Sequence, residues 1–341
     1  CNAQGKTNIL EAVYYAACGS SFRGNSDGEL IKWNADGGSI SLGFSRLEVV
    51  NQLDFAFRRD KRRTIVYNGQ KIPLRELIGA FNVVLFAPDD LLLIKGAPAG
   101  RRKFLDMEIS QASPAYYREL ITYNRLLQQR NSLLKEIREG KSKAGMLEFW
   151  NPQLAASAAK ITAKRLEAVQ KFNMLANLMQ RRISGNEENL SLSYQIKGME
   201  NGQLAENMEI WYNEMLHGLN NEEIYRGVTC VGPHRDDIIV SVNGINLKSF
   251  GSQGQQRTAV LSMKLSELEF IRSETGEYPV LLLDDVMSEL DAGRRQQLLN
   301  FIEREGIQTL ITATDEAYFQ QAPLKTYFQV EAGQVKVVNK V

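Results

Sequence analysis

The chain has 341 residues, 43% of them hydrophobic, and its 41 lysines and arginines against 40 aspartates and glutamates give a net charge of +1. This length is enough for a substantial core and predicts two lobes, while the charge balance excludes a uniformly basic protein, so any basic surface must be local. No apolar run is long enough to span a bilayer. The three cysteines, Cys1, Cys18 and Cys230, show no pairing pattern and favour a reducing cytoplasm over a disulfide framework.

The first residues resemble the end of a phosphate-binding loop. Gly5-Lys6-Thr7 fills the last three positions of G-x-x-x-x-G-K-[ST], so the first glycine and the preceding strand are expected before Cys1, in a few tens of missing residues. Lys6 is expected at the β- and γ-phosphates of a nucleotide and Thr7 on its Mg²⁺. The other nucleotide contacts are assigned to Asn2, Ala3, Gln4, Gly5 and Asn8. Apolar residues at helical spacing from Ile9 to Ala17 predict the helix that such a loop precedes.

Two segments predict β-hairpins. Thr64–Gln70 and Ile238–Ile245 each carry Asn-Gly at the turn, which is a strong local signal. Both hairpins are expected in an antiparallel sheet beside the nucleotide core, which the chain enters near residue 30 and again near residue 225.

Residues 105–185 predict an antiparallel helical hairpin. One apolar stripe runs from Tyr116 to Leu134 and another from Leu154 to Phe172, with a polar turn between Gly140 and Gly145. The two stripes are expected to pack against each other, in arms only a few heptads long.

Three basic clusters occur along the chain, and each is either a solvated face or a phosphate contact. Their members are Arg58, Arg59, Lys61, Arg62 and Arg63; Arg101, Arg102 and Lys103; and Lys160, Lys164 and Arg165.

Residues 252–255 predict a second anion site. Ser252-Gln253-Gly254-Gln255 is similar to the Leu-Ser-Gly-Gly-Gln signature of ABC proteins, with Gln253 in place of the first glycine. A helix with Leu261, Leu265, Leu268 and Ile271 along one face follows, so free amides at its N-terminus would bind phosphate. Taken alone, the segment favours an ordinary loop before a helix, and the strand with two aspartates that follows it supports the signature interpretation.

Val280–Leu283 predicts a strand buried on both faces of a parallel sheet, and it ends on Asp284 and Asp285. Asp284 is expected to hold Mg²⁺ and Asp285 to orient or activate the attacking water. The alternative is that both aspartates only cap the next helix. Asp291 is expected to cap the helix 292–304 and to contact a partner copy near the nucleotide.

Residues 308–314 predict the next strand, in a right-handed βαβ unit. Transporter-type ABC heads end this strand in a histidine that senses the γ-phosphate. Thr312, Ala313 and Thr314 stand there instead, so a hydroxyl, assigned to Thr314, takes that role.

Together these motifs predict an α/β, ABC-type P-loop ATPase head with a mixed or parallel core sheet and an inserted short antiparallel helical lobe. Residues 1–88 and 225–341 are assigned to the ATPase lobe and 89–224 to the helical lobe. ATP and Mg²⁺ would lie between two copies, one contributing Lys6 and Asp284, the other Ser252 and Gly254. ATP binding would then favour a homodimer and hydrolysis would release it.

The chain resembles the RecF family of bacterial recombination mediators over nearly its whole length. Besides the segments above, the resemblance is carried by Phe86–Leu91, Arg101–Asp106, Gln129–Leu134 and Val231–Asp237. It implies a cytoplasmic, slow, DNA-stimulated ATPase that binds DNA as an ATP-bound dimer. It also implies RecO- and RecR-like partners and recombinase loading at single-strand gaps. His234 lies in a segment typical of the family, where it is either functional or a satisfied turn histidine.

Two other functions stay open. The chain could be the head of an SMC-like chromosome-organising complex, although its helical hairpin is short for such arms. It could also be the ATPase half of a nuclease or a transporter, although it shows no acidic nuclease cluster beyond Asp284 and Asp285 and no switch histidine.

Overall fold

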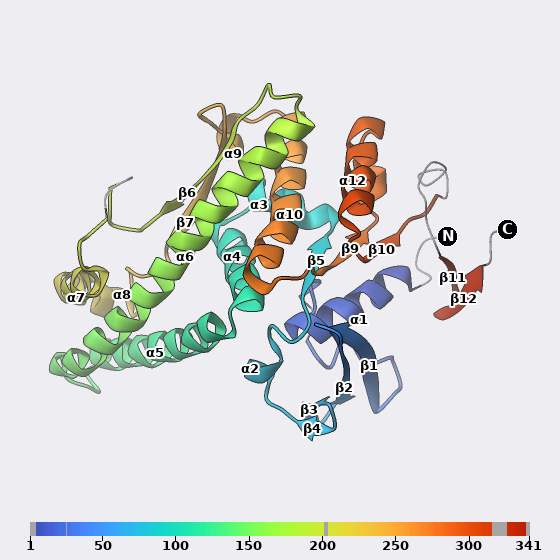
Figure 1. The fold of residues 1–341 in the computed structure, drawn as a ribbon. Coiled ribbons are helices and arrows are strands. Elements are labelled where there is room, and N and C mark those ends of the chain that lie inside the picture. Colours follow the sequence, from blue (N-terminus) through green and yellow to red (C-terminus); the bar gives the residue numbers. More distant parts are fainter. Residues whose placement is uncertain (1–4, 25, 201–203, 316–325, 339–341) are drawn as a thin grey trace. The chain divides into compact units, whose positions relative to one another are not determined.

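The computed structural model describes residues 5–24, 26–200, 204–315 and 326–338 (Figure 1). It contains two compact units, one of Cys1–Asp90 with Lys264–Val341 and the other of Leu91–Met263. The α/β class expected from the sequence is confirmed.

The core of the first unit is a parallel sheet of three strands in the order β10-β9-β5. The central strand β9 (Val280–Asp284) pairs with β5 (Val83–Phe86) on one side and β10 (Thr309–Thr312) on the other. Leu281, Leu282 and Leu283 are buried, as a strand covered on both faces requires. Helix α1 (Lys6–Cys18) packs against all three strands, and α11 (Val286–Glu289) and α12 (Ala292–Glu305) connect β9 to β10.

The first unit also contains an antiparallel sheet of four strands, β1 (Gly37–Arg46), β2 (Val49–Arg58), β3 (Lys61–Tyr67) and β4 (Gln70–Lys71). Its remaining elements are α2 (Leu74–Leu77) and a hairpin of β11 (Tyr327–Glu331) and β12 (Gln334–Val338). Asn68 and Gly69, at φ 48° and 80°, form the turn between β3 and β4. Two positive φ angles are what a two-residue hairpin turn needs, so the Asn-Gly prediction is correct here. Tyr15 of α1 packs edge-on against Phe55 and Phe57 of β2.

The second unit is built around the predicted helical hairpin. Its arms are α5 (Pro114–Arg138) and α6 (Leu147–Ile183), which pack against each other, with the short 3₁₀ turn η2 (Ala144–Met146) before α6. The other elements are η1 (Pro88–Leu91) at the boundary, α3 (Leu92–Lys95), α4 (Pro98–Ala112), α7 (Met208–Gly218), α8 (Asn220–Arg226) and α9 (Leu247–Phe250). Helix α10 (Gln253–Thr275) begins in this unit and ends in the first.

The second Asn-Gly hairpin lies in a different sheet from the first, contrary to expectation. β7 (Asp237–Val242) and β8 (Ile245–Asn246) pair with β6 (Leu190–Gln195), the strand that follows α6. Because this pairing joins residues 237–246 to the helical hairpin, the second unit extends to residue 263. Residues 225–263, which we assigned to the ATPase lobe, therefore pack with the helical lobe.

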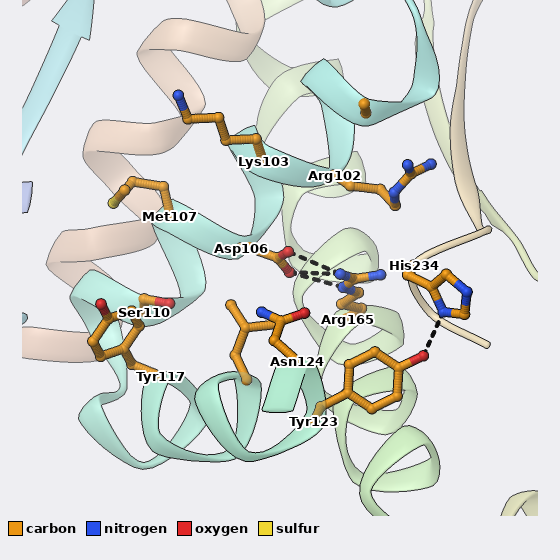
Figure 2. A pocket seen from close by; sticks show the side chains of 12 residues that line it. Arg102, Lys103, Asp106, Met107, Ser110, Tyr117, Tyr123, Asn124, Arg165 and His234 are labelled. Carbon is orange, nitrogen blue, oxygen red and sulfur yellow. Dashed lines mark hydrogen bonds and ion pairs between the residues drawn. The ribbon is translucent and has the colours of Figure 1, made fainter. Parts of the chain in front are cut away.

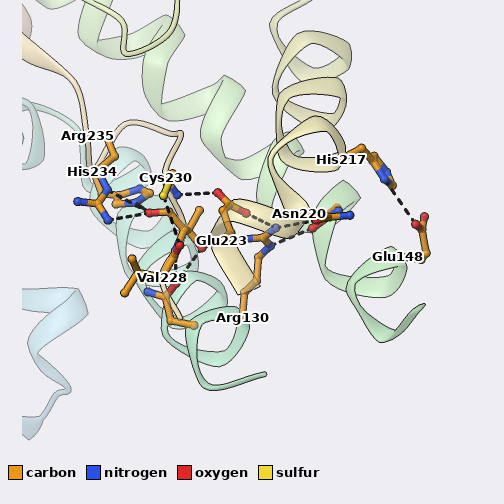
Figure 3. A network of polar contacts seen from close by, with 12 residues as sticks. Arg130, Glu148, His217, Asn220, Glu223, Val228, Cys230, His234 and Arg235 are labelled. Atoms are coloured by element: carbon orange, nitrogen blue, oxygen red, sulfur yellow. Dashed lines mark hydrogen bonds and ion pairs between the residues drawn. The ribbon is translucent and has the colours of Figure 1, made fainter. Parts of the chain in front are cut away.

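A buried ion pair links α5 to α8 (Figure 3). Nη2 of Arg130 lies 2.7 Å from Oε2 of Glu223, and both side chains are fully buried. Arg130 also donates to Asn151 and Thr229, and Glu223 accepts from the amide of Cys230. Burial raises the pKa of the Glu223 carboxyl, and the nearby Arg130 only partly offsets it. Desolvation therefore outweighs attraction, as in many buried pairs.

Replacing either partner alone strands the other charge in the interior. We expect Arg130→Leu and Glu223→Leu each to lower the free energy of unfolding by about 3–5 kcal/mol. The double variant should lose clearly less than the sum of the two. Urea unfolding of the four proteins gives this coupling, and strict additivity would contradict it.

Candidate nucleotide site

Gly5 begins the site. It precedes α1 with φ 104° and ψ 7°, a left-handed conformation that favours glycine. The turn at Gly5 starts α1 at Lys6, so the first-turn amides of the helix face the region before it. A helix N-terminus of this kind binds anions.

A shared carboxylate oxygen joins three distant segments. Oγ1 of Thr7 donates to Oδ1 of Asp284 at 2.9 Å, and Oγ1 of Thr312 donates to the same oxygen at 2.8 Å. Asp284 is 9% exposed. The first turn of α1 and the carboxyl ends of β9 and β10 therefore meet at one point, at the strand edge where ligands bind in α/β sheets.

Lys6 lies at the same edge. Its Nζ donates to the carbonyl of Ala313 at 2.6 Å, directly after β10. Of the hydroxyls at the end of this strand, Thr312 is engaged by Asp284, while Thr314 is exposed. The γ-phosphate role of Thr314 remains a prediction that this exposure permits.

Asp285 has an unusual backbone conformation and an unpaired side-chain oxygen within the described residues. It has φ 54° and ψ 19°, and although it occupies the N-cap position of α11 its side chain makes no capping bond. Its Oδ1 is buried and has no hydrogen-bond partner in the described part of the protein. A buried carboxylate oxygen without a partner needs an explanation, such as a bound water or ion. The geometry disfavours the helix-cap interpretation for Asp285.

Asp291 does cap α12, as we predicted. It accepts from the amide of Arg294 at 2.9 Å and pairs with the guanidinium of that arginine at 2.6 Å. The hydrogen bond from the backbone N–H of Arg294 lowers the pKa of the Asp291 carboxyl, and the charge of the Arg294 guanidinium lowers it further. Contact with a partner copy stays a prediction.

The predicted signature segment, Ser252–Gln255, forms a capping box at the start of α10. Oγ of Ser252 accepts from the amide of Gln255 at 3.2 Å, and Oε1 of Gln255 accepts from the amide of Ser252 at 3.1 Å. Ser252, Gln253 and Gly254 are exposed. A Cβ added at Gly254 would meet only the Ser252 hydroxyl, at 3.9 Å. Nothing within the described chain therefore requires glycine at this position.

Other site predictions have different outcomes. Asn2, Ala3 and Gln4 lie outside the described residues. Asn8 is exposed, and its side-chain oxygen accepts from Arg23 at 3.2 Å.

The basic clusters divide into buried and exposed members. Arg101 forms a two-bond pair with Asp237 at 2.7 and 2.8 Å, and Arg165 forms one with Asp106 at 2.8 and 2.9 Å. Arg63 binds the Tyr15 hydroxyl and pairs with Asp27. Arg101 and Arg165 are buried, while Arg63 and Arg102 are partly exposed. The exposed basic side chains of the clusters are Arg58, Arg59, Lys61, Arg62, Lys103, Lys160 and Lys164. Charge alone does not distinguish buried from exposed arginines in these clusters. The helical spacing does so for Arg165, because it follows the buried Ile161 by four residues and lies on the same inward face of α6.

His234 borders a pocket of about 330 Å³ in the second unit (Figure 2). The pocket is also lined by Arg102, Lys103 and Arg165. Nε2 of His234 lies 3.2 Å from the carbonyl of Thr229, which can only accept, so Nδ1 accepts from the hydroxyl of Tyr123 at 2.5 Å. Burial, helped by Arg235, lowers the pKa of His234 to about 4. His234 is thus a neutral, fully bonded turn histidine.

Comparison with known proteins decides the family. The chain is 46% identical over 318 residues to the DNA replication and repair protein RecF of Halothermothrix orenii, across 92% of this chain and 84% of that protein. It is 43% identical over 321 residues to RecF of Alkaliphilus oremlandii, across 92% and 85%. The chain belongs to the RecF family. No family model matches it.

Solved structures agree with this assignment. The structure described as "recombination mediator protein RecF-ATPrS in RecFOR pathway" superposes with a TM-score of 0.91 at 35% identity, across 99% of this chain and 90% of that one. An Smc head bound to the C-winged helix domain of ScpA gives 0.53 at 15% identity, across 99% and 88%, which shows the fold alone. The expected RecF resemblance and ATPase-head fold are confirmed. Within its described residues this RecF-family chain has no helix both long and apolar enough to cross a membrane.

The buried neutral His234 predicts a specific pH dependence. Its folded pKa lies below the ordinary 6.5, so the stability it supports is complete above pH 6.5 and is lost as pH falls toward 4. Asp236 acts in the opposite direction, because burial raises its pKa to about 6. We therefore compare the parent with His234→Gln, since the glutamine amide offers the same donor and acceptor. Between pH 7.5 and 5 the parent should lose about 2 kcal/mol more than the variant in urea unfolding. Parallel pH profiles would contradict this assignment.

Proposed function

We propose that this protein is an ATP-dependent DNA-binding protein of recombinational repair and replication restart, acting in the cytoplasm. It dimerises on ATP, hydrolyses it slowly with stimulation by DNA, and works with RecR- and RecO-like partners to load a recombinase at single-strand gaps. Family membership supports the repair role, and the RecF structures described with ATP and ATPrS support the nucleotide.

The observation that carries this proposal is the contact between Thr7 and Asp284. A hydroxyl from the phosphate loop and a carboxylate from a buried strand end are the hard oxygen donors that Mg²⁺ takes in nucleotide sites. Thr7 and Asp284 would hold the ion, which neutralises charge on the β- and γ-phosphates when bound. Lys6 would exchange the Ala313 carbonyl for the phosphates. Asp285, whose Oδ1 has no partner among the described residues, would hold the attacking water.

The second half of the site is assigned to another copy. The exposed N-terminus of α10 offers amides and the Ser252 hydroxyl, and Gly254 leaves room for close approach of a phosphate. Because ATP would touch both copies only in the dimer, its binding energy favours that state. Hydrolysis removes the γ-phosphate and with it the bridge.

DNA binding is assigned to the exposed basic side chains. Lys61 and Arg62 at the β2–β3 turn and Lys160 and Lys164 on α6 are exposed, and the surface ion pairs of the two lysines on α6 with Glu119 and Glu167 can open to solvent. Arg101, in contrast, is buried in its pair with Asp237. Phosphate contacts of this kind weaken steeply with salt. The alternative of a chromosome-organising head is disfavoured because α6, the longer arm, has 37 residues and spans only about 55 Å.

Lys6→Met and Asp285→Asn should separate nucleotide binding from hydrolysis in the full-length protein. Lys6→Met should abolish the ATP-dependent dimer in sedimentation velocity, since the γ-phosphate loses its charge partner. Asp285→Asn should still dimerise, with ATP turnover reduced about 10²-fold or more because the base is lost. A Lys6→Met protein that dimerises and binds DNA normally with ATP would refute the mechanism.

Gly254→Ala tests the signature segment without disturbing the fold. The open space at Gly254 predicts a change in unfolding free energy within about 0.5 kcal/mol. The added methyl should nevertheless block a phosphate from the second copy, so dimerisation with ATP should fail. Gly100→Ala is the matched control, because Gly100 also lies in the first turn of a helix and its Cβ would meet nothing within 4 Å. Normal dimerisation of Gly254→Ala would remove this segment from the site.

A further inference from the structure

A chain of side-chain hydrogen bonds connects the signature segment to the longer arm of the hairpin. Nε2 of Gln255 donates to Oε1 of Glu188 at 3.1 Å, and Nε2 of Gln180 donates to Oε2 of the same carboxylate at 2.6 Å. Oγ of Ser262 then donates to Oε1 of Gln180 at 2.7 Å. All four residues lie within the unit Leu91–Met263. Glu188 thus joins the start of α10, through Gln180 on α6, to the middle of α10.

The carboxylate of Glu188 decides how both amides point. An ionised carboxylate only accepts, so Gln255 and Gln180 must each turn their NH₂ groups toward it. Their oxygens then face the opposite way. The oxygen of Gln255 accepts from the amide of Ser252, and the oxygen of Gln180 accepts from Ser262. Gln180 is fully buried and cannot exchange these bonds for water.

The same arrangement fixes the signature loop. The side-chain oxygen of Gln255 forms half of the capping box, and the NH₂ group of the same side chain donates to Glu188. Glu188 in turn is tied to the end of α6, where its amide donates to the Ser184 hydroxyl at 3.1 Å. A shift of the last turn of α6 would therefore move Glu188 and strain the bonds that set the Ser252–Gln255 geometry.

We propose that Glu188 is a positioning residue for the trans-acting nucleotide contact. It holds the signature segment in the geometry that accepts the γ-phosphate of a second copy, and it couples that geometry to the arm helix α6. This inference rests on the proposed ATP-dependent dimer. Glu188 itself makes no contact with nucleotide. Its effect passes through Gln255, so it should alter association of the two copies and leave ATP binding at Lys6 unchanged.

The first test uses Glu188→Ala in the full-length protein, with Glu187→Ala as control. Glu187 is the neighbouring exposed carboxylate. Its backbone amide donates to the carbonyl of Ser184 and its backbone carbonyl accepts from Asn243, so these contacts of the residue are made by its backbone. Glu188→Ala should weaken the ATP-bound dimer at least about tenfold in sedimentation velocity, as expected for loss of a charge-assisted bond. Fluorescent ATP titrated at concentrations where the protein is monomeric should bind as tightly as to the parent. Glu187→Ala should match the parent in both measurements.

Glu188→Gln tests whether the hydrogen bonds of residue 188 are what supports ATP-dependent dimerisation. Its amide can accept from Gln255 and donate to a flipped Gln180, whose NH₂ then faces the Ser262 oxygen. Dimerisation should recover to within about threefold of the parent, because every hydrogen bond has a replacement. Gln180→Met removes the link to α6 and should weaken the dimer as Glu188→Ala does. The double variant Glu188→Ala/Gln180→Met should form a dimer no weaker than that of either single variant, because both changes break the same chain of hydrogen bonds.

The outcomes separate this inference from the function on which it rests. If the parent fails to dimerise with ATP, both are overturned. If Gly254→Ala abolishes the dimer while Glu188→Ala dimerises normally, the positioning role alone is refuted. It is also refuted if Glu188→Ala loses thermal stability and ATP affinity in proportion to dimerisation. A normal dimer with Gln180→Met would overturn the coupling to α6.

Discussion

The site depends on one carboxylate oxygen, Oδ1 of Asp284, that accepts from two hydroxyls. Thr7 reaches it from 277 residues away along the chain and Thr312 from 28 residues away. These two bonds set the carboxylate plane and bring the start of α1 to the ends of β9 and β10. Together with the packing of α1 against the three strands, they place Lys6 and Asp285 at the same edge of the sheet.

Asp285 shows what this arrangement costs. A left-handed conformation in a residue other than glycine and a buried carboxylate oxygen without a partner each cost roughly 1–3 kcal/mol. Asn68 and Asn243 also have positive φ, but there the angle is what the hairpin turn needs. Asp285 is the single residue between β9 and α11, so its positive φ turns the chain directly from the strand into the helix. The Oδ1 atom of Asp285, which has no hydrogen-bond partner among the described residues, fits the proposal that this oxygen binds a water.

Local patterns predicted much of this molecule. The apolar run before Asp284, the glycine before Lys6 and the two Asn-Gly turns each depend on neighbouring residues, and each was found where expected. Long-range pairing was not predictable in this way. The sheet joining β6 to β7 brings residues 237–242 to the helical lobe, so the expected return at residue 225 did not mark the unit boundary. The basic clusters misled for a similar reason, since the face of the helix decides whether an arginine such as Arg165 is solvated or buried.

Both proposed halves of the nucleotide site use an acceptor-only group to orient their donors. Asp284 directs two hydroxyls, and Glu188 directs two amides that could otherwise adopt either orientation. A glutamine side chain alone does not specify which end binds phosphate and which end binds protein. An ionised carboxylate removes that ambiguity, because only one orientation of each amide satisfies it. Gln255 therefore presents a defined capping box with the Ser252 hydroxyl beside it, and the signature segment is ordered by its own chain before any second copy arrives. Such preorganisation would lower the entropy cost of the proposed association, so a residue without nucleotide contact would act on the proposed dimer through Gln255.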